Sequence, residues 1–207
     1  MAYVLGFFAA DGYMTVTKRG SEFWCIQITD KSLLYKIRTV IQSEHKISIR
    51  KSKTDNKTLY RLQIGSKEMC ENLRSLGFRE RKTKSLSVPY IPDKFLPDFV
   101  RGYFDGDGNV WVSKKEAKNR QNILTVFTSN SYDFLKNLHQ QLGNLGIKGG
   151  SLYKSKDNYS RLQFSLWDSL KLYEIMYNNN IKDSDFIYLR RKKQVFDKFV
   201  CGRSSTG

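Results

Sequence analysis

Residues 99–108 read FVRGYFDGDG, and residues 3–12 read YVLGFFAADG. The two stretches align at an offset of 96 residues, so that each closes with an Asp-Gly pair. Each is apolar before that pair and carries small residues four positions apart, namely Gly6 and Ala10, and Gly102 and Gly106. Residues at this spacing lie on one face of a helix, and small ones let two backbones approach closely. The sequence therefore predicts two helices that pack against each other.

Both predicted helices end on an aspartate, Asp11 or Asp107, followed by a glycine. Glycine is the usual residue for the left-handed turn that closes a helix. The aspartate is unfavourable there, by about 0.3–1 kcal/mol, because a helix C-terminus carries partial negative charge. If the helices pack side by side, the two carboxylates also approach each other and need a shared proton or a cation. We therefore predict a metal site at Asp11 and Asp107; the alternative is that each aspartate is a solvent-exposed cap.

The two stretches resemble the paired LAGLIDADG motifs of single-chain homing endonucleases, and the resemblance extends over nearly all 207 residues. The first copy departs from the family pattern because it has Ala9 where the second has Asp105. The metal-binding acid of the family is the last one, so this departure concerns helix packing more than chemistry. The resemblance implies that the backbone carbonyls of Ala10 and Gly106 are further metal ligands.

The composition of the chain indicates what kind of partner it binds and in which kind of compartment it lies. The formal net charge is +16, which suggests a polyanionic partner. No apolar run approaches the roughly 18 residues of a membrane span, and no signal peptide is evident. Cys25, Cys70 and Cys201 are odd in number and widely spaced, which favours reduced thiols in an intracellular protein, in a bacterial cytoplasm or an organelle. His45 and His139 stand alone and offer no zinc site.

Hydrophobic periodicity and turn residues predict the same order of elements in each half: helix, two strands, helix, two strands, helix. After the first motif we expect strands at 13–17, 22–29, 47–53 and 59–64, and helices at 32–43 and 66–76. After the second motif we expect strands at 109–113, 123–129, 151–154 and 159–165, a loop at 114–122, and helices at 131–145, 167–177 and 184–200.

A second internal match supports a duplication, because residues 60–64 (YRLQI) match residues 160–164 (SRLQF). We therefore predict an α+β fold that duplicates an αββαββα unit with pseudo-two-fold symmetry. Its parts are an N-terminal half at 1–77, a proline-containing linker at 78–97, a C-terminal half at 98–200 and a disordered tail at 201–207. The resemblance implies antiparallel sheets that form a saddle over DNA, with the motif helices at the centre.

Half-buried strands alternate, so the face opposite the core can be predicted. With Leu62 and Ile64 inward, Arg61 and Gln63 face outward; Arg can bind guanine and Gln can bind adenine in the major groove. The predicted DNA-facing side chains are Thr15, Thr17, Arg19, Gln27, Ser48, Arg50, Ser52, Arg61, Gln63, Trp111, Ser113, Lys115, Thr125, Tyr153, Ser155, Arg161 and Gln163. The alternative is an ordinary solvated strand face, which the charge of +16 disfavours for the surface as a whole.

Hydrolysis of a phosphodiester needs an activated water, neutralisation of developing charge and a stabilised leaving oxygen. A divalent cation held by few carboxylates can supply all three. We predict Mg²⁺ in this role, with Mn²⁺ as a substitute and Ca²⁺ as an ion that binds without supporting cleavage. Asp11 and Asp107 would each serve one strand cut.

The resemblance also implies a basic residue near each scissile phosphate. The matching positions are Lys82 and Lys192. Because both lie in basic clusters, the alignment with the family pattern can equally place this residue at Lys84 or Arg191. The alternative role of these clusters is general phosphate binding.

Asp30 and Asn130 are expected at equivalent positions, at the end of the second strand of each half. The family often keeps a polar residue there that orients water. Because one residue of the pair is an acid and the other an amide, the two strands of DNA are expected to be cut at unequal rates.

These features predict a monomeric, metal-dependent homing endonuclease that makes a double-strand break in a long asymmetric site in double-stranded DNA. The resemblance implies a mobile gene that lies in an intron or intein and spreads by cutting the empty allele. Because no splicing-type Cys or Asn block flanks the chain, we expect a free-standing or intron-encoded enzyme and not a whole intein. The rival from another class is a maturase that binds intron RNA and assists splicing. A third candidate is a DNA-binding protein that does not cleave.

Overall fold

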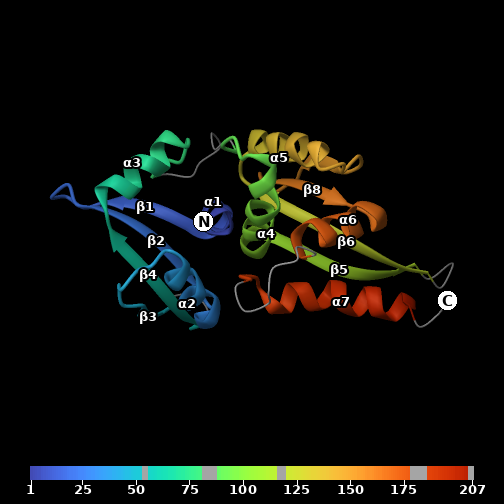
Figure 1. The fold of residues 1–207 in the computed structure, drawn as a ribbon, viewed down its shortest axis with the longest axis horizontal. Coiled ribbons are helices and arrows are strands. Elements are labelled where there is room, and N and C mark those ends of the chain that lie inside the picture. Colours follow the sequence, from blue (N-terminus) through green and yellow to red (C-terminus); the bar gives the residue numbers. More distant parts are fainter. Residues whose placement is uncertain (53–55, 81–87, 116–119, 178–185, 205–207) are drawn as a thin grey trace.

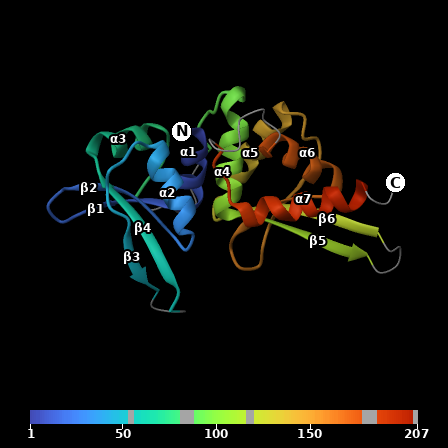
Figure 2. The same cartoon turned by 60° about the horizontal axis from the view of Figure 1, so that its bottom comes forward.

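The computed structural model describes residues 1–52, 56–80, 88–115, 120–177 and 186–204 (Figure 1). Two helices, α1 (Ala2–Asp11) and α4 (Leu96–Asp107), lie side by side at the centre, with one sheet on each side (Figures 1 and 2). Both are the motif helices that the sequence predicts. Within the described residues, each sheet has four antiparallel strands.

The two halves repeat the same strand order. The first sheet has the order β1-β2-β4-β3 and the second has the order β5-β6-β8-β7. After α1 the chain forms β1 (Gly12–Val16), β2 (Glu22–Ile28), α2 (Lys31–Val40), β3 (Ser48–Lys51), β4 (Thr58–Gly65) and α3 (Lys67–Ser75). A short 3₁₀ helix (Asp93–Phe95) leads into α4, which is followed by β5 (Gly108–Lys115), β6 (Arg120–Ser129), α5 (Tyr132–Asn144), β7 (Ser151–Lys154), β8 (Ser160–Phe164), α6 (Leu166–Tyr177) and α7 (Arg190–Ser204). This confirms the duplicated α+β unit.

The contact between α1 and α4 depends on glycine in both helices. A Cβ atom placed on Gly6 would lie 2.0 Å from the carbonyl oxygen of Phe99. A Cβ atom placed on Gly102 would likewise lie 2.0 Å from the carbonyl oxygen of Tyr3. These distances are far shorter than a carbon–oxygen contact, so any larger residue would force the two backbones apart. The small-residue face is therefore the helix–helix interface, as predicted.

The glycine after each motif helix has a different role from the one predicted. Gly12 (φ −81°, ψ 161°) and Gly108 (φ −87°, ψ 159°) are extended and lead directly into β1 and β5, so neither adopts the left-handed turn. A Cβ atom on Gly12 would lie 1.9 Å from the ring of Phe8, and one on Gly108 would lie 2.2 Å from the ring of Phe104. Glycine is needed here because an aromatic ring of the helix occupies that space.

A single apolar cluster joins the two halves. It contains Phe7 and Phe8 of α1, Tyr103 and Phe104 of α4, and inward side chains of both sheets. The ring of Phe8 stacks on Trp24 of β2, and the ring of Phe104 contacts Phe127 of β6 edge-on. The motif helices thus bury one side against each other and the other side against their own sheet, which fixes the position of their C-terminal ends.

Several element boundaries differ from the predictions. Leu96 and Pro97, expected in the linker, form the first turn of α4, where proline is well tolerated because its missing N–H would be unpaired anyway. The expected loop at 114–122 is shorter, because β5 continues to Lys115 and β6 begins at Arg120.

The last helix and the tail also differ. Residues 186–189 are not helical; Phe186, Ile187 and Leu189 are buried in the core, and α7 begins only at Arg190. The expected disordered tail is helical at 201–204, and 205–207 lie outside the described residues. None of the described helices is long and apolar enough to cross a membrane.

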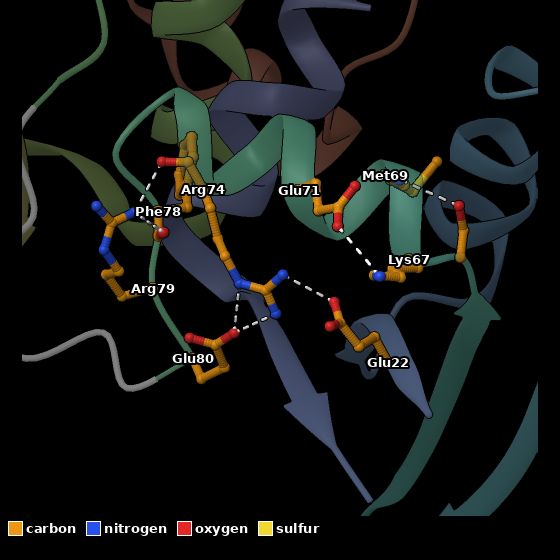
Figure 3. A network of polar contacts seen from close by, with 9 residues as sticks. Glu22, Lys67, Met69, Glu71, Arg74, Phe78, Arg79 and Glu80 are labelled. Carbon is orange, nitrogen blue, oxygen red and sulfur yellow. Dashed lines mark hydrogen bonds and ion pairs between the residues drawn. The ribbon is translucent and has the colours of Figure 1, made fainter. Parts of the chain in front are cut away.

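A cluster of ion pairs holds the chain where it leaves α3 (Figure 3). The guanidinium of Arg74 donates to Oε1 of Glu80 from Nε (2.7 Å) and Nη2 (2.5 Å). It also pairs with Glu22, at the start of β2, over 2.8 Å. Arg74 holds the pKa of Glu80 below its usual range. The cluster fixes the first residues after the third helix, just before the basic cluster that contains Lys82.

Candidate metal and nucleic-acid site

The two motif aspartates gather at one end of the helix pair. Asp11 and Asp107 are the last residues of α1 and α4, and both are exposed. A Cβ atom on Gly106 would lie 3.3 Å from Oδ2 of Asp11, so that this carboxylate lies beside the last turn of α4. Burial raises the pKa of Tyr103 well above its ordinary value, and the negative charges of Asp107 and Asp11 raise it further. Both carboxylates are therefore close enough to act on the same buried hydroxyl.

The donor atoms at this point fit a hard divalent cation. The carboxylates of Asp11 and Asp107 and the nearby backbone carbonyls offer only oxygen, which Mg²⁺, Mn²⁺ and Ca²⁺ prefer. Among the described residues, no group of three or more His, Cys, Asp or Glu side chains could hold a metal. A cation at the two aspartates would thus need further oxygens from water or from a bound phosphate. The role of the Ala10 and Gly106 carbonyls stays a prediction.

A cleft of about 410 Å³ opens beside Asp11, and both halves contribute to it. The polar residues from the first half are Asp11, Gln27, Thr29 and Asp30. From the second half, Asp105, Gly106, Leu189 and Arg191 line it. The structure therefore brings together three side chains that the sequence singled out, from α1, β2 and the start of α2, with an arginine more than 160 residues away in the chain.

Asp30 lies at this cleft and also begins a helix. Its Oδ1 accepts a hydrogen bond from the backbone N–H of Leu33 over 2.8 Å and so caps α2. The equivalent cap in the second half is Ser131, whose hydroxyl oxygen accepts from the N–H of Phe134 at the start of α5.

The predicted equivalence of Asp30 and Asn130 is therefore wrong by one residue. The sheets pair Gly12 with Ile26 in the first half and Gly108 with Phe127 in the second, which sets the offset of the second strands at 101. The counterpart of Asn130 is thus Thr29, and Asn130 itself is exposed before the cap.

Lys192 is buried rather than directed at a substrate. Its amine donates to the carbonyl oxygens of Phe104 (2.6 Å), Asp105 (2.8 Å) and Gly108 (2.6 Å), and lies 3.3 Å from that of Gly106. Burial lowers the pKa of Lys192 to about 8. The amine neutralises the negative end of α4. The exposed basic residue beside it, at the cleft, is Arg191. Lys82 and Lys84 lie outside the described residues.

Asp105 is buried beside the same turn. Its Oδ2 accepts one hydrogen bond from the hydroxyl of Tyr3 in α1 and one from the N–H of Leu189, each over 2.7 Å. Its Oδ1 is buried and, within the described residues, has no hydrogen-bond partner. Burial raises the pKa of Asp105 to about 6. Asp105 therefore joins three segments, a role that its position in the motif did not predict.

The outer face of the first sheet carries the polar row that alternation predicts. Gln27, Arg61 and Ser48 lie opposite one another on β2, β4 and β3. On this face the structure adds Cys25, which is fully buried, with the guanidinium of Arg61 3.6 Å from its sulfur. Arg61 also lies over the ring of Tyr13, at 5.9 Å. Alternation between the buried Trp24 and Ile26 could have placed Cys25 on this face. The other predicted residues here are half-buried or exposed: Thr15, Thr17, Arg19, Arg50, Ser52 and Gln63.

The outer face of the second sheet has its side chains linked in pairs. The hydroxyl of Tyr153 donates to Oε1 of Gln163 over 3.1 Å, and Arg161 donates to the hydroxyl of Tyr159 over 2.7 Å. Of the other predicted residues, Trp111 is exposed, and Ser113 and Ser155 are half-buried. Lys115 belongs to β5, but its side chain lies outside the described part of the chain.

The prediction that Thr125 faces DNA is wrong. Thr125 is fully buried, between Val110 of β5 and Phe164 of β8, both of which face the core. The register places its side chain inward although it is polar. Its hydroxyl is buried and, within the described residues, has no hydrogen-bond partner.

Comparison with known proteins bears on the family and the fold. A family model described as a LAGLIDADG-like domain matches residues 1–76 and 95–183. The chain is 25% identical over 194 residues to an uncharacterised protein of Methanocaldococcus jannaschii, which covers 88% of this chain and 67% of that protein. It is 32% identical over 139 residues to a probable translation initiation factor IF-2 of Thermococcus kodakarensis, covering 63% of this chain. The match spans only 11% of that factor's length.

Solved structures share the fold at low sequence identity. The homing endonuclease I-DmoI in complex with DNA and Ca has a TM-score of 0.60 and 17% identity, with 89% of this chain and 93% of that chain covered. The LAGLIDADG meganuclease I-AabMI bound to uncleaved DNA has a TM-score of 0.59 and 18% identity, with 99% and 91% covered. A structure of I-DmoI with DNA and Mn is also similar, with a TM-score of 0.57 and 18% identity over 87% of this chain and 97% of that chain.

Proposed function

Because this chain belongs to the LAGLIDADG-like domain family, we propose that it is a metal-dependent DNA endonuclease that makes a double-strand break in a long asymmetric target. The observation that carries the proposal is the position of Asp11 and Asp107. They end two helices that pack through glycine, and Asp11 lines a cleft to which both halves contribute. A purely structural helix pair has no need of two carboxylates at its negative ends.

The outer faces of the two sheets supply the surface for DNA. In the first half, Gln27, Arg61 and Ser48 form a polar row, and in the second, Arg161 and Gln163 stand at the positions that match Arg61 and Gln63. The net charge of +16 provides the sequence-independent attraction to phosphates. The two faces carry different side chains around this shared pair, so the two half-sites would differ and the target would not be a perfect palindrome.

The chemistry is assigned to the end of the helix pair. Asp11 and Asp107, with the carbonyls of Ala10 and Gly106, would hold a divalent cation, for which we propose Mg²⁺, with Mn²⁺ able to replace it. When bound, the cation neutralises developing charge and lowers the pKa of a bound water. Arg191 can pair with a phosphate in the cleft through its guanidinium.

Polar side chains of the first half complete this cleft. Gln27 and Asp30 line it next to Asp11, and their oxygens can accept hydrogen bonds from a water positioned for attack. Asp30 already accepts one bond, from the N–H of Leu33, so its orientation is fixed by the helix it caps. In this proposal one chain contributes both motifs, and the enzyme acts as a monomer. Its gene would spread by cutting intron-free alleles.

The proposal is tested with DNA whose sequence is not known in advance. Purified protein is incubated with Mg²⁺ and a plasmid library that contains a randomised segment, and linearised plasmids are recovered and sequenced. We expect a single asymmetric motif to be recovered. EDTA should stop cleavage of that motif, and Asp11→Asn or Asp107→Asn should lower its rate by at least about a thousandfold, because each variant removes a carboxylate from the metal site.

The matched control is Asp133→Asn, which removes an exposed carboxylate from the first turn of α5, away from the cleft. It should cut at the wild-type rate. Binding of the selected DNA by the inactive variants would show that they remain folded. Recovery of no cleaved motif, together with tight binding to intron RNA and faster splicing, would replace the nuclease with a maturase.

A further inference from the structure

We propose that Asp105 and Lys192 form a clamp that holds residues 189–192 against the last turn of α4 and so directs the guanidinium of Arg191 into the cleft beside Asp11. The inference rests on the proposed function and deepens it. Neither clamp residue would touch the substrate. Both are positioning residues, and they act at one of the two cleavage sites.

The first contact of the clamp is made by Asp105. Its buried Oδ2 accepts from the N–H of Leu189 over 2.7 Å, 84 residues away in the chain. The same oxygen accepts from the hydroxyl of Tyr3 over 2.7 Å, which ties the carboxylate to α1. A buried hydrogen bond to a carboxylate is costly to break, because the group left unpaired has no water to replace its partner. Leu189 is therefore held on the helix pair itself.

The second contact is made by Lys192, three residues further on. Its buried amine donates to the carbonyls of Phe104, Asp105 and Gly108, where α4 ends and β5 begins. These carbonyls carry the partial negative charge of the helix end, so the ammonium is bound where the field is most favourable. The N–H of Lys192 also donates to the carbonyl of Leu189 over 3.0 Å, which joins the two contacts.

Arg191 lies between these contacts. Leu189 and Lys192 are buried, and α7 begins at Arg190, so the backbone of Arg191 is fixed on both sides. Successive side chains of a helix diverge by about 100°. With Lys192 directed into the core, Arg191 is directed outward, and it lines the cleft together with Asp11 and Gly106. A guanidinium held in this way loses little entropy when it binds a phosphate.

The first half cannot make the same first contact. The position that matches Asp105 is Ala9, and the position that matches Tyr3 is Phe99, which has no hydroxyl. The clamp therefore belongs to one cleft, and its loss should slow the cutting of one DNA strand. A general loss of stability would instead slow both strands alike.

The experiment measures the cutting of each strand separately, with the target recovered from the randomised library labelled on one strand at a time. We expect Asp105→Ala to slow one strand by about a hundredfold, the size of effect that misplacing a reacting group by about 1 Å can have. The other strand should change by less than about threefold. Asp105→Asn keeps an oxygen that can accept from Tyr3 and Leu189, and it should restore most of the lost rate.

A double variant separates positioning from any direct role. If Asp105 acts through Arg191, Asp105→Ala combined with Arg191→Ala should be no slower than Arg191→Ala alone. If the rate lost by the double variant instead equals the product of the factors lost by the two single variants, Asp105 and Arg191 act independently, and the clamp is overturned. Equal slowing of both strands by Asp105→Ala would also overturn it. Lys198→Ala, which removes an exposed charge further along α7, serves as the control and should leave both strands unchanged.

Hydrogen exchange tests the clamp without any cleavage. In the full-length protein, the amide of Leu189 should exchange at least about tenfold faster in Asp105→Ala than in Asp105→Asn. If Asp105→Ala does not fold, Tyr3→Phe replaces it, since it removes only the hydroxyl that bonds Oδ2. Recovery of no DNA target would overturn the proposed function alone, and unchanged exchange at Leu189 would overturn the clamp alone.

Discussion

The two halves hold the chain after their third helix in different ways. In the first half, the anchor is the half-exposed set of ion pairs that Arg74 makes with Glu80 and Glu22. In the second half, it is the buried pair of contacts from Asp105 to Leu189 and from Lys192 to the end of α4. Exposed ion pairs contribute about 0–1 kcal/mol and weaken with salt, whereas breaking a buried charged contact costs several times more. A duplicated backbone can therefore keep its symmetry while its two sites diverge in rigidity.

The largest effect is expected where the halves are equivalent. Gly6→Val and Gly102→Val each place side-chain atoms against the backbone of the facing helix. We expect each to lower the free energy of unfolding by about 3 kcal/mol, because the helices must separate. Urea unfolding measures this loss.

The control for this pair is Gly143→Ala in α5, where an added Cβ atom meets nothing within 4 Å. Because glycine is unfavourable inside a helix, this change should stabilise the protein by about 0.5–1 kcal/mol. A large loss from only one of the two valine variants would show that the helix interface is not symmetric.

The next prediction concerns a variant that places an aspartate in the first half at the position that matches Asp105. Ala9→Asp buries a carboxylate at the position that matches Asp105, whereas the position that matches Tyr3 is Phe99 and has no hydroxyl; an unpaired buried charge costs about 3 kcal/mol. Adding Phe99→Tyr should recover part of the loss, because the new hydroxyl can donate to the carboxylate. Thermal unfolding of these two variants and of the unchanged protein measures both changes. If Ala9→Asp alone is neutral, the difference between the halves at this position has no energetic basis.

The features that depend on local sequence pattern could be predicted from the sequence. The repeated motif and the glycine spacing predicted the helix pair and the position of Asp11 and Asp107, because both depend on local pattern. The order of helices and strands along each half was also predicted, since each half repeats the same alternation and turn residues. Thr125 was misplaced because alternation along a strand does not by itself fix which set of side chains faces the core, and only the pairing with Val110 and Phe164 reveals its inward side chain.

Other features depend on contacts between distant segments. The burial of Lys192 follows from where α4 ends and where residues 186–189 pack, which no local pattern encodes. Sequence reasoning kept Arg191 only as an alternative register, and the cleft now places it beside Asp11. The partners of Asp105 are 102 and 84 residues away, so no local pattern could predict its contacts.

A smaller effect is expected from the paired side chains on the second sheet. Because the hydroxyl of Tyr153 donates to Oε1 of Gln163, one lone pair of this oxygen is occupied, whereas both N–H groups of the amide stay available to DNA. Gln163 should select an acceptor, such as guanine O6 or N7, whereas Gln63 can bind adenine with both groups. Tyr153→Phe should shift the preference at one base pair toward adenine by about tenfold, measured by repeating the library selection. An unchanged motif would contradict this role for Tyr153.

The smallest effect is expected at the half-exposed anchor that Arg74 makes with Glu80 and Glu22. Arg74→Met removes the ion pairs to Glu80 and Glu22, and it should cost about 0.5–1 kcal/mol at low salt. The loss should shrink in 1 M NaCl, where charges are screened within about 3 Å. A loss as large at high salt as at low salt would place this anchor in the same class as the buried one.

The central claim is that Asp11 and Asp107 hold a divalent cation against DNA, and Mn²⁺ tests it most directly. Mn²⁺ is added to the protein bound to its selected target, and the broadening of backbone amide signals is recorded by NMR. We predict selective broadening around the C-terminal ends of α1 and α4, and its loss in the variant that carries both Asp11→Asn and Asp107→Asn. Unbroadened signals there, together with cleavage that persists in EDTA, would contradict the account.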